Sequence, residues 1–377
     1  MQSHSYTDRG TPCFAGGGKV RVLVVDDSPL MRQMLTSILS SDPDIEVVGQ
    51  AADAYQAREQ IKALNPDVLT LDVEMPGMNG IQFLSNLMRL RPMPVVMVSA
   101  LTSEGSTATL DALELGAVDF IEKPKVKSEA VLNNYTRGII EKVKNASRAR
   151  VQNFRPHVAA APVPPRPATT ATPGSSMQRL QSRMSVTSGK MVAIGSSTGG
   201  TEALKEVLTR FPADMPPVVI TQHIPPAFSA SFAERMNMIC EMTVAQATEG
   251  MEIVNGHVYI APGDRHLVVR SSGGKLYCHL DDSEPVNQHK PSVEVMFDSI
   301  CKIAPRKTVA VMLTGMGDDG ADAMKRLREA GSYTVAQDEA TSVVWGMPGQ
   351  AYKRGAVVKL KPLQEIANEV ISQIQQL

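Results

Sequence analysis

A stretch rich in proline, residues 151–188, limits what this chain can fold into. Six prolines stand there among alanine, threonine and serine, and no regular spacing of apolar residues runs through the stretch. Such a composition buries too little apolar surface to offset the entropy lost when a core is ordered. We therefore expect an extended linker between two folded domains, residues 19–150 and 189–377, with a disordered extension at residues 1–18.

The composition narrows the class of protein further. The 377 residues are 43% hydrophobic and 20% charged, and a net charge of −1 gives no general attraction to nucleic acid or to an anionic membrane. The four cysteines lack C-x-x-C spacing, which argues against a zinc site or a disulfide framework. No apolar run approaches membrane-spanning length, and residues 1–18 lack a signal-peptide pattern. We expect a soluble, cytoplasmic protein with reduced thiols.

Five short apolar runs alternate with helical patterns in residues 19–150. This alternation predicts a doubly wound parallel β-sheet of five strands. The strands are expected at residues 20–25, 45–48, 68–71, 94–98 and 118–121, and the helices between them near residues 29–39, 54–64, 81–90 and 106–115.

Polar residues follow four of these strands. Asp26 and Asp27 follow the first strand, and Asp72 ends the third. Ser99 ends the fourth strand and Lys123 follows the fifth. Three carboxylates at one sheet edge repel each other unless a divalent cation, Mg²⁺ before others, neutralises them. A single aspartate after a strand often only caps the next helix, but the shared position of all five residues favours a phosphoryl-accepting site.

The same alternation resumes at Met191 and predicts a second doubly wound α/β domain. Its apolar first run stops in Gly195-Ser-Ser-Thr-Gly199, which fits the G-x-S-x-G pattern of a nucleophile elbow with Ser197 at the centre. A glycine-rich turn or a phosphate-cradling loop fits this stretch as well. Further strands are expected at residues 218–221, 258–260, 309–313 and 332–336, and helices at 201–208, 229–238, 293–303 and 321–329.

Two more predicted strands in this half are followed by residues that can take part in catalysis. His223 follows the strand at 218–221, and the adjacent Asp318 and Asp319 lie in a glycine-rich loop after residues 309–313. Together with Ser197 they supply every member of a serine–histidine–aspartate triad. The alternatives stay open, because either aspartate could cap the next helix and other histidines could be the base. These rival histidines are His257, His266, His279 and His289.

The first domain resembles a response-regulator receiver domain, which has a flavodoxin-like fold. The resemblance lies in residues 25–28, 71–80, 98–100 and 121–124. It implies that Asp72 accepts a phosphoryl group from a histidine kinase, and that Mg²⁺ is held by Asp26, Asp27 and Asp72. It further implies that Ser99 moves toward the phosphoryl group and that Lys123 is its counter-ion.

The second domain resembles the catalytic domain of the chemotaxis protein-glutamate methylesterase (CheB) family. The matching motifs are residues 194–200, 222–224, 261–263, 313–320 and 337–342, with the region of Ser292. The resemblance makes Ser197 the nucleophile, His223 the general base and Asp319 the carboxylate that orients the histidine. It places Thr198 and Met316 beside them. Ser196 stands where many relatives have alanine and is the alternative nucleophile.

The joint resemblance implies a phosphorylation-activated hydrolase of chemotaxis adaptation. It would remove methyl esters from glutamates of chemoreceptors, release methanol and deamidate receptor glutamines, without a cofactor for the hydrolysis itself. The receiver would cover the catalytic cleft until it is phosphorylated. A rival hypothesis is a second domain that only binds a nucleotide or a protein at residues 195–200, although this loop lacks the lysine of a P-loop. No basic recognition helix indicates DNA binding.

Overall fold

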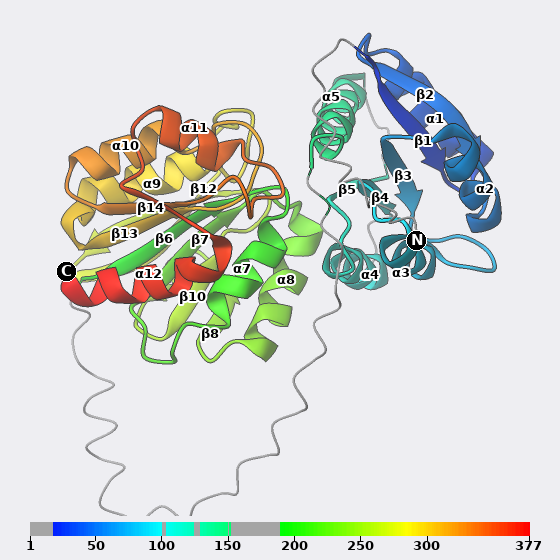
Figure 1. The fold of residues 1–377 in the computed structure, drawn as a ribbon. Coiled ribbons are helices and arrows are strands. Elements are labelled where there is room, and N and C mark those ends of the chain that lie inside the picture. Colours follow the sequence, from blue (N-terminus) through cyan, green and yellow to red (C-terminus); the bar gives the residue numbers. More distant parts are fainter. Residues whose placement is uncertain (1–17, 100–102, 124–128, 150, 152–188) are drawn as a thin grey trace, which may run out of the picture.

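The computed structural model describes residues 18–99, 103–123, 129–149, 151 and 189–377 (Figure 1). The extension and nearly all of the linker expected from the sequence lie outside these residues. None of the helices in the described part of the chain is long and apolar enough to cross a lipid bilayer.

The first domain is a parallel five-stranded sheet, as the sequence predicts, and its strand order is β2-β1-β3-β4-β5. Successive residues of β1 point to opposite faces of the sheet. Leu23 and Val25 join the core under α2, α3 and α4, whereas Val22 and Val24 join the core under α1 and α5. The elements are β1 Val20–Val25, α1 Pro29–Ser40, β2 Ile45–Ala51, α2 Ala54–Leu64, β3 Val68–Asp72, α3 Gly80–Leu90, β4 Val95–Ser99, α4 Ser103–Glu114, β5 Asp119–Glu122 and α5 Glu129–Ala146.

The second domain is built on a parallel seven-stranded sheet with the order β15-β14-β13-β6-β7-β10-β8. Helices α7, α8 and α12 cover one face, and α9, α10 and α11 cover the other (Figure 1). The strands are β6 Met191–Ser196, β7 Val218–Gln222, β8 Thr243–Gln246, β10 His257–Ile260, β13 Thr308–Met312, β14 Tyr333–Gln337 and β15 Lys359–Lys361. The helices are α7 Gly200–Leu208, α8 Pro226–Ile239, α9 Val293–Ile303, α10 Ala321–Glu329, α11 Met347–Lys353 and α12 Leu363–Gln376.

The sequence prediction missed part of this domain. It contained neither edge strand, β8 or β15, and none of the small antiparallel sheet of β9 Glu252–Ile253, β11 His266–Ser272 and β12 Lys275–Asp281. The central strands and the doubly wound class were predicted correctly.

Strand β6 lies at the point where the winding of the second sheet reverses. Its neighbours are β7 on one side and β13 on the other, and the chain builds outward from both. The carboxyl ends of strands at such a switch point form the usual binding crevice of an open α/β sheet. The ends of β13, β6 and β7 are therefore where a site is expected.

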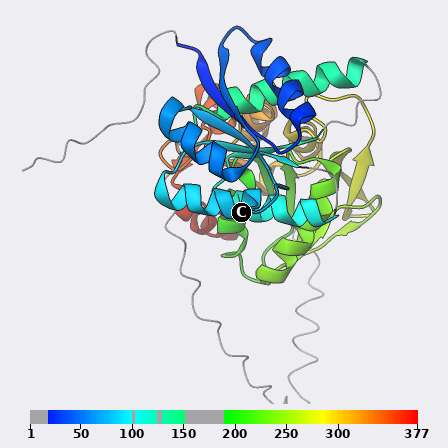
Figure 2. The same cartoon turned by 90° about the vertical axis from the view of Figure 1, so that its right-hand side faces the viewer.

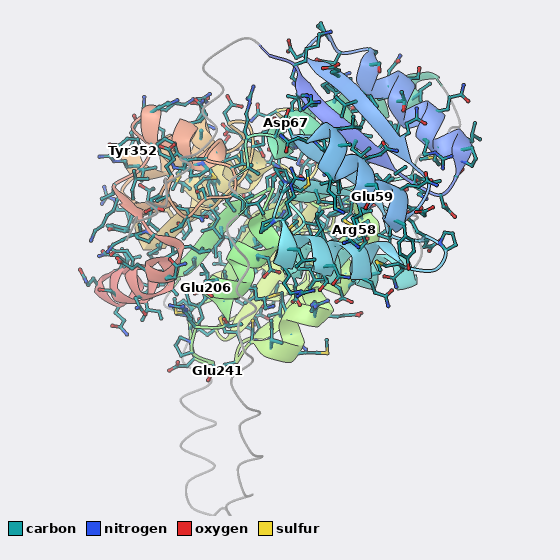
Figure 3. The ribbon with its side chains drawn as sticks, turned by 45° about the vertical axis from the view of Figure 1, so that its right-hand side comes forward. Arg58, Glu59, Asp67, Glu206, Glu241 and Tyr352 are labelled. Atoms are coloured by element: carbon teal, nitrogen blue, oxygen red, sulfur yellow. The ribbon has the colours of Figure 1, made fainter. Side chains whose placement is uncertain are left out.

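The two domains pack against each other through α4 and β5 of the first and α7 and α8 of the second (Figures 1 and 2). The rings of Phe120 and Phe228 lie 4.4 Å apart between centroids, and the apolar core continues across the boundary. Ion pairs flank this contact, with Lys205 Nζ at 2.6 Å from Glu114 and Arg235 at 2.6 Å from Asp111. Away from it, charged side chains such as Arg58, Glu59 and Glu241 are exposed to solvent (Figure 3).

Candidate active site

The five strand-end residues predicted in the first domain lie at one edge of its sheet. Asp26 follows β1 and Asp72 ends β3, both buried, whereas Asp27 is exposed. Lys123 Nζ is 2.7 Å from Asp72 Oδ2 and 3.3 Å from Asp26 Oδ2. Ser99 ends the neighbouring strand β4, and its carbonyl accepts a hydrogen bond from the backbone N–H of Lys123 at 2.8 Å. The structure therefore brings all five residues together.

This pocket holds more negative charge than its donors satisfy. Burial raises the pKa of Asp72 to about 6, and the charge of Asp26 adds to the effect against the hydrogen bond from Lys123. Asp26 Oδ2 is buried, and its one partner among the described residues is Lys123 Nζ at 3.3 Å, which Asp72 holds more closely. One carboxylate oxygen from each of Asp26, Asp27 and Asp72 lies within 4.8 Å of the others. Such an oxygen set fits a hard divalent cation.

The lysine of the pocket responds to the same charges. Burial lowers the pKa of Lys123, but its hydrogen bond and Coulomb interaction with Asp72, together with Asp26, outweigh burial and raise that pKa. Lys123 is therefore held as an ammonium beside the two buried carboxylates.

In the second domain, the turn after β6 separates the two candidate serines. Ser196 is fully buried and donates its hydroxyl to Gln222 Oε1 at 2.6 Å. The amide of Gln222 also donates to the carbonyl of Ser197 at 2.9 Å. Ser197 itself is only partly buried. Of the two hydroxyls, the one of Ser197 is therefore the better placed to meet a substrate.

The turn also shows why glycine follows the serines. Gly199 has φ +74, and an added Cβ would lie 2.7 Å from Val343. A Cβ at Gly200 would lie 2.2 Å from Gln222 Oε1. These glycines allow a tight reversal between β6 and α7, which leaves Ser197 at the carboxyl edge of the sheet.

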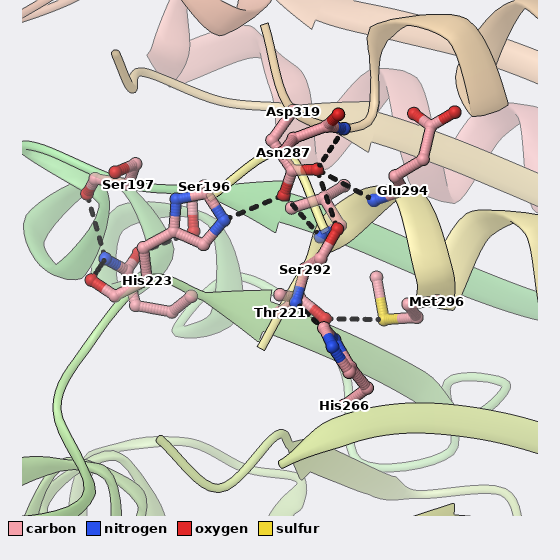
Figure 4. A network of polar contacts seen from close by, with 12 residues as sticks. Ser196, Ser197, Thr221, His223, His266, Asn287, Ser292, Glu294, Met296 and Asp319 are labelled. Carbon is pink, nitrogen blue, oxygen red and sulfur yellow. Dashed lines mark hydrogen bonds and ion pairs between the residues drawn. The ribbon is translucent and has the colours of Figure 1, made fainter. Parts of the chain in front are cut away.

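His223 follows β7 and contacts a buried carboxylate that follows β13. Its Nε2 lies 2.9 Å from Asp319 Oδ2 (Figure 4). Asp319 also accepts hydrogen bonds from Asn287 Nδ2 at 2.9 Å and from Ser292 Oγ at 2.7 Å. Burial alone would raise the pKa of Asp319, but the bond from His223 and those from Asn287 and Ser292 outweigh burial and hold it at about 2. Asp319 is therefore ionised, and Nε2 of His223 carries the proton.

The other ring nitrogen of His223, Nδ1, does not take part in the contact with Asp319. Nδ1 is buried and has no hydrogen-bond partner in the described parts of the chain. Figure 4 shows the ring between the turn of Ser196 and Ser197 and the carboxylate of Asp319. A neutral imidazole with its proton on Nε2 presents a lone pair at Nδ1, which can act as a base toward the serine side.

Asp319 and the adjacent Asp318 have different surroundings in the structure. Asp318 is half exposed and forms an ion pair at the surface with Arg354, the residue that follows α11. Among the rival histidines, His266 is buried, and its Nδ1 accepts a hydrogen bond from the backbone N–H of Ser292. His279 pairs with Glu249, and His257 contacts the carbonyl of Asn255. None of these three contacts His223 or Asp319 through a hydrogen bond found among the described residues.

Thr198 and Met316 both lie next to Ser197. Thr198 follows it directly and donates its hydroxyl to Asp119 Oδ2 of the first domain at 2.7 Å. Met316 follows Gly315, where an added Cβ would lie 2.8 Å from Ser197 Cβ. The loop after β13 therefore runs alongside the serine. The sequence prediction did not include Asn287 or the contacts of His289, because they come from a loop without apolar periodicity.

Comparison with known proteins identifies a family for each of the two domains. The response regulator receiver domain model matches residues 22–133, and the CheB methylesterase model matches residues 192–370. A protein-glutamate methylesterase/protein-glutamine glutaminase of Hydrogenovibrio crunogenus is 50% identical over 372 residues, covering 94% of this chain and 99% of the relative. One from Xanthomonas campestris pv. campestris is 51% identical over 354 residues, covering 94% and 97%. The chain therefore belongs to the family of CheB-type protein-glutamate methylesterases/protein-glutamine glutaminases, with a receiver and a methylesterase domain.

Proposed function

We propose that this protein hydrolyses glutamate methyl esters on chemoreceptors, releases methanol, and deamidates receptor glutamines under control of phosphorylation at Asp72. The observation that carries the proposal is the pairing of ionised Asp319 with His223 Nε2, which leaves Nδ1 without a hydrogen-bond partner among the described residues, on a ring that lies beside the turn of Ser197 (Figure 4). The names of the relatives support the substrate class.

The geometry suggests how each residue acts. Ser197 Oγ attacks the ester carbonyl while His223 Nδ1 takes its proton, and Asp319 stabilises the imidazolium that forms. The backbone around Thr198 and Met316 borders the position of the developing oxyanion. His223 then returns the proton to the leaving methoxide, and methanol departs. Water attacks the acyl-enzyme with the same base, and an amide follows the same route with loss of ammonia.

In the receiver, we propose that Asp72 accepts the phosphoryl group of a chemotaxis histidine kinase. Asp26, Asp27 and Asp72 would hold Mg²⁺, which when bound offsets the charge on the phosphoryl oxygens. Lys123, which pairs with both buried aspartates, would be the counter-ion of the phosphoryl group, and Ser99 would move toward that group. Such a kinase and the signalling helices of receptors meet in the cytoplasm, which is where we place the reaction.

Control would act through the contact between the domains. Asp119 of β5 accepts a hydrogen bond from Thr198, the residue after the proposed nucleophile, and Phe120 packs on Phe228. At the other end of β5, the backbone N–H of Lys123 donates a hydrogen bond to the carbonyl of Ser99 in the proposed phosphorylation pocket. A change at Ser99 therefore reaches β5 directly. An interface of this kind is biased by a few kcal/mol, which is the scale of a phosphorylation switch.

The test is methanol release from methylated receptor membranes by the full chain, with and without acetyl phosphate as phosphodonor. We expect release by the wild type, faster release with the phosphodonor, and none with Ser197→Ala. Ser196→Ala is the matched control, and its rate should stay near that of the wild type. Full activity of Ser197→Ala with loss in Ser196→Ala would reverse the serine assignment, and no release by the wild type would reject the esterase proposal.

A further inference from the structure

The proposed base of the active site is stacked on a second imidazole. The rings of His223 and His289 lie 3.8 Å apart between centroids, with an angle of 11° between their planes. His289 belongs to the loop between β12 and α9, far from His223 in sequence. Its ring covers one face of His223, while the edge of His223 that bears Nε2 is bonded to Asp319.

A tight turn holds His289 in this position. The backbone groups of Val286 and His289 bond to each other in both directions, at 3.1 and 2.9 Å. The two residues between them, Asn287 and Gln288, have φ values of +51 and +66. Residues other than glycine rarely adopt this left-handed conformation because it costs free energy. The turn delivers two side chains to the site, Asn287 to Asp319 and His289 to His223.

The stack supplies a restraint that the hydrogen bond lacks. The outer torsion of a histidine side chain has a broad energy profile, so one bond at Nε2 does not fix the plane of the ring. A ring packed on one face of His223 resists rotation out of that plane, and it also keeps water off that face. Nδ1 of His223 then stays directed to the serine side. Small errors in such a direction lower rates strongly.

We propose that His289 is a positioning residue for catalysis, which holds the ring of His223 on the line between Asp319 and Ser197 by stacking against it. The inference rests on the proposed function, since it concerns the same base. His289 does not need to contact the substrate for this role.

His289 is suited to the role because it stays uncharged. Burial, with a smaller contribution from the nearby charge of His223, lowers the pKa of His289 to about 3. When His223 takes the serine proton, it therefore gains a positive charge next to a neutral aromatic ring. A second imidazolium would instead repel it and oppose the proton transfer.

The experiment compares His289→Ala with His289→Phe in the full chain with acetyl phosphate, measuring methanol release over a range of methylated receptor concentrations. Phenylalanine keeps a flat ring but removes both nitrogens. We expect His289→Ala to lower kcat by roughly 10- to 100-fold with KM changed by less than about twofold, and His289→Phe to recover kcat to within about fivefold of the wild type. Fluorescence of Trp345, the single tryptophan, checks that each variant is folded.

Two control variants, His279→Ala and Ser197→Ala, distinguish failure of this inference from failure of the proposed function. His279→Ala removes a histidine that pairs with Glu249 away from the triad, and should keep the wild-type rate. An unchanged kcat in His289→Ala would overturn the inference, as would a raised KM at unchanged kcat or a His289→Phe as slow as His289→Ala. In all these cases an active wild type and an inactive Ser197→Ala leave the proposed function intact. A wild type without activity would overturn both the proposed esterase function and the role of His289.

Discussion

The two sites of this protein use the same place in the fold but treat buried carboxylates in opposite ways. Both lie at the carboxyl ends of adjacent parallel strands in a doubly wound sheet. In the receiver, burial raises the pKa of Asp72, and among the described residues Asp26 Oδ2 has only a share of Lys123, whose Nζ lies 3.3 Å away and closer to Asp72. In the catalytic domain, Asp319 has a bond from each of three side chains, and its pKa stays at about 2.

This difference separates two kinds of site. A pocket with uncompensated negative charge gains stability when a cation enters it, so it is expected to respond to a divalent ion. A carboxylate whose lone pairs are already satisfied is fixed before the substrate arrives, as a preorganised catalytic site requires. The following experiments test this contrast.

The largest effect is expected for Asp319→Asn. The amide cannot stabilise an imidazolium at His223 and can favour the wrong tautomer, so kcat should fall by roughly 10³- to 10⁴-fold. Methanol release with acetyl phosphate measures this loss. Asp318→Asn is the matched control, because Asp318 pairs with Arg354 at the surface, and its rate should stay within about twofold of the wild type. Similar losses in both variants would contradict the assignment of Asp319.

A pH effect on stability is expected from His289, because burial prevails over its other interactions, whereas at Asp319 the hydrogen bonds outweigh burial. Burial, His223 and Lys142 lower its pKa to about 3 against the opposing effect of Asp319, whereas an unfolded histidine titrates near pH 6.5. Below pH 6.5 the unfolded state therefore binds more protons than the folded state, and the free energy of unfolding decreases as the pH is lowered. Between pH 7 and pH 5 this group should cost the wild type about 2 kcal/mol of unfolding free energy.

Urea unfolding followed by the fluorescence of Trp345 measures this quantity in the catalytic domain. His289→Phe should lose about 2 kcal/mol less than the wild type between the two pH values, since it has no proton to bind there. Equal losses in the two proteins would show that His289 is accessible to protons in the folded state.

In the receiver, Asp26→Asn should stabilise the metal-free domain. The change removes one of two buried carboxylates that share Lys123, so the free energy of unfolding should rise by about 1–2 kcal/mol without Mg²⁺. Adding 10 mM Mg²⁺, a concentration of the order used to saturate such oxygen sites, should raise the thermal midpoint of the wild type and leave the variant nearly unchanged. A destabilised variant would mean that Asp26 is compensated in the same way as Asp319.

The smallest effect concerns Asp119, a carboxylate that lies between the two sites. Asp119→Ala removes the bond to Thr198, worth about 1 kcal/mol, and should raise methanol release without a phosphodonor by roughly fivefold. The rate with acetyl phosphate should stay near that of the wild type. Asp53→Ala, which removes a helix cap at the surface, is the control. An unchanged basal rate would show that this bond does not restrain the catalytic domain.

Strand ends made much of both sites predictable. Asp26, Asp72 and Lys123 follow apolar runs of the first domain, and His223 follows one in the second, so a parallel sheet had to bring each group to a common edge. The residues at these positions are also brought together in the structure. The choice of Asp319 over Asp318 came only from resemblance, because adjacent residues in a glycine-rich loop have the same pattern. Burial and partners distinguish them in the structure.

Other features had no signal of their own. Strands β8 and β15 are short edge strands with partly polar sequences, so they lack the continuous apolar run of a central parallel strand. The turn at Asn287 and Gln288 is left-handed at both residues, a conformation that asparagine tolerates but glutamine does not favour. Its position is fixed by contacts with Asp319 and His223, which are distant in sequence. Local pattern cannot report such contacts.

The switch-point position of β6 has a consequence for how activity appears during folding. Met191 pairs with Thr308, so strand β6, which precedes the proposed nucleophile Ser197, is completed only when a segment made much later in synthesis joins it. Pairings between distant segments carry a large loop-closure entropy and form slowly. A partly folded chain can therefore hold β6 and β7, with Ser197 and His223 close together, while Asp319 is still absent. Esterase activity in refolding should return with this last pairing, after most of the helical structure has already formed.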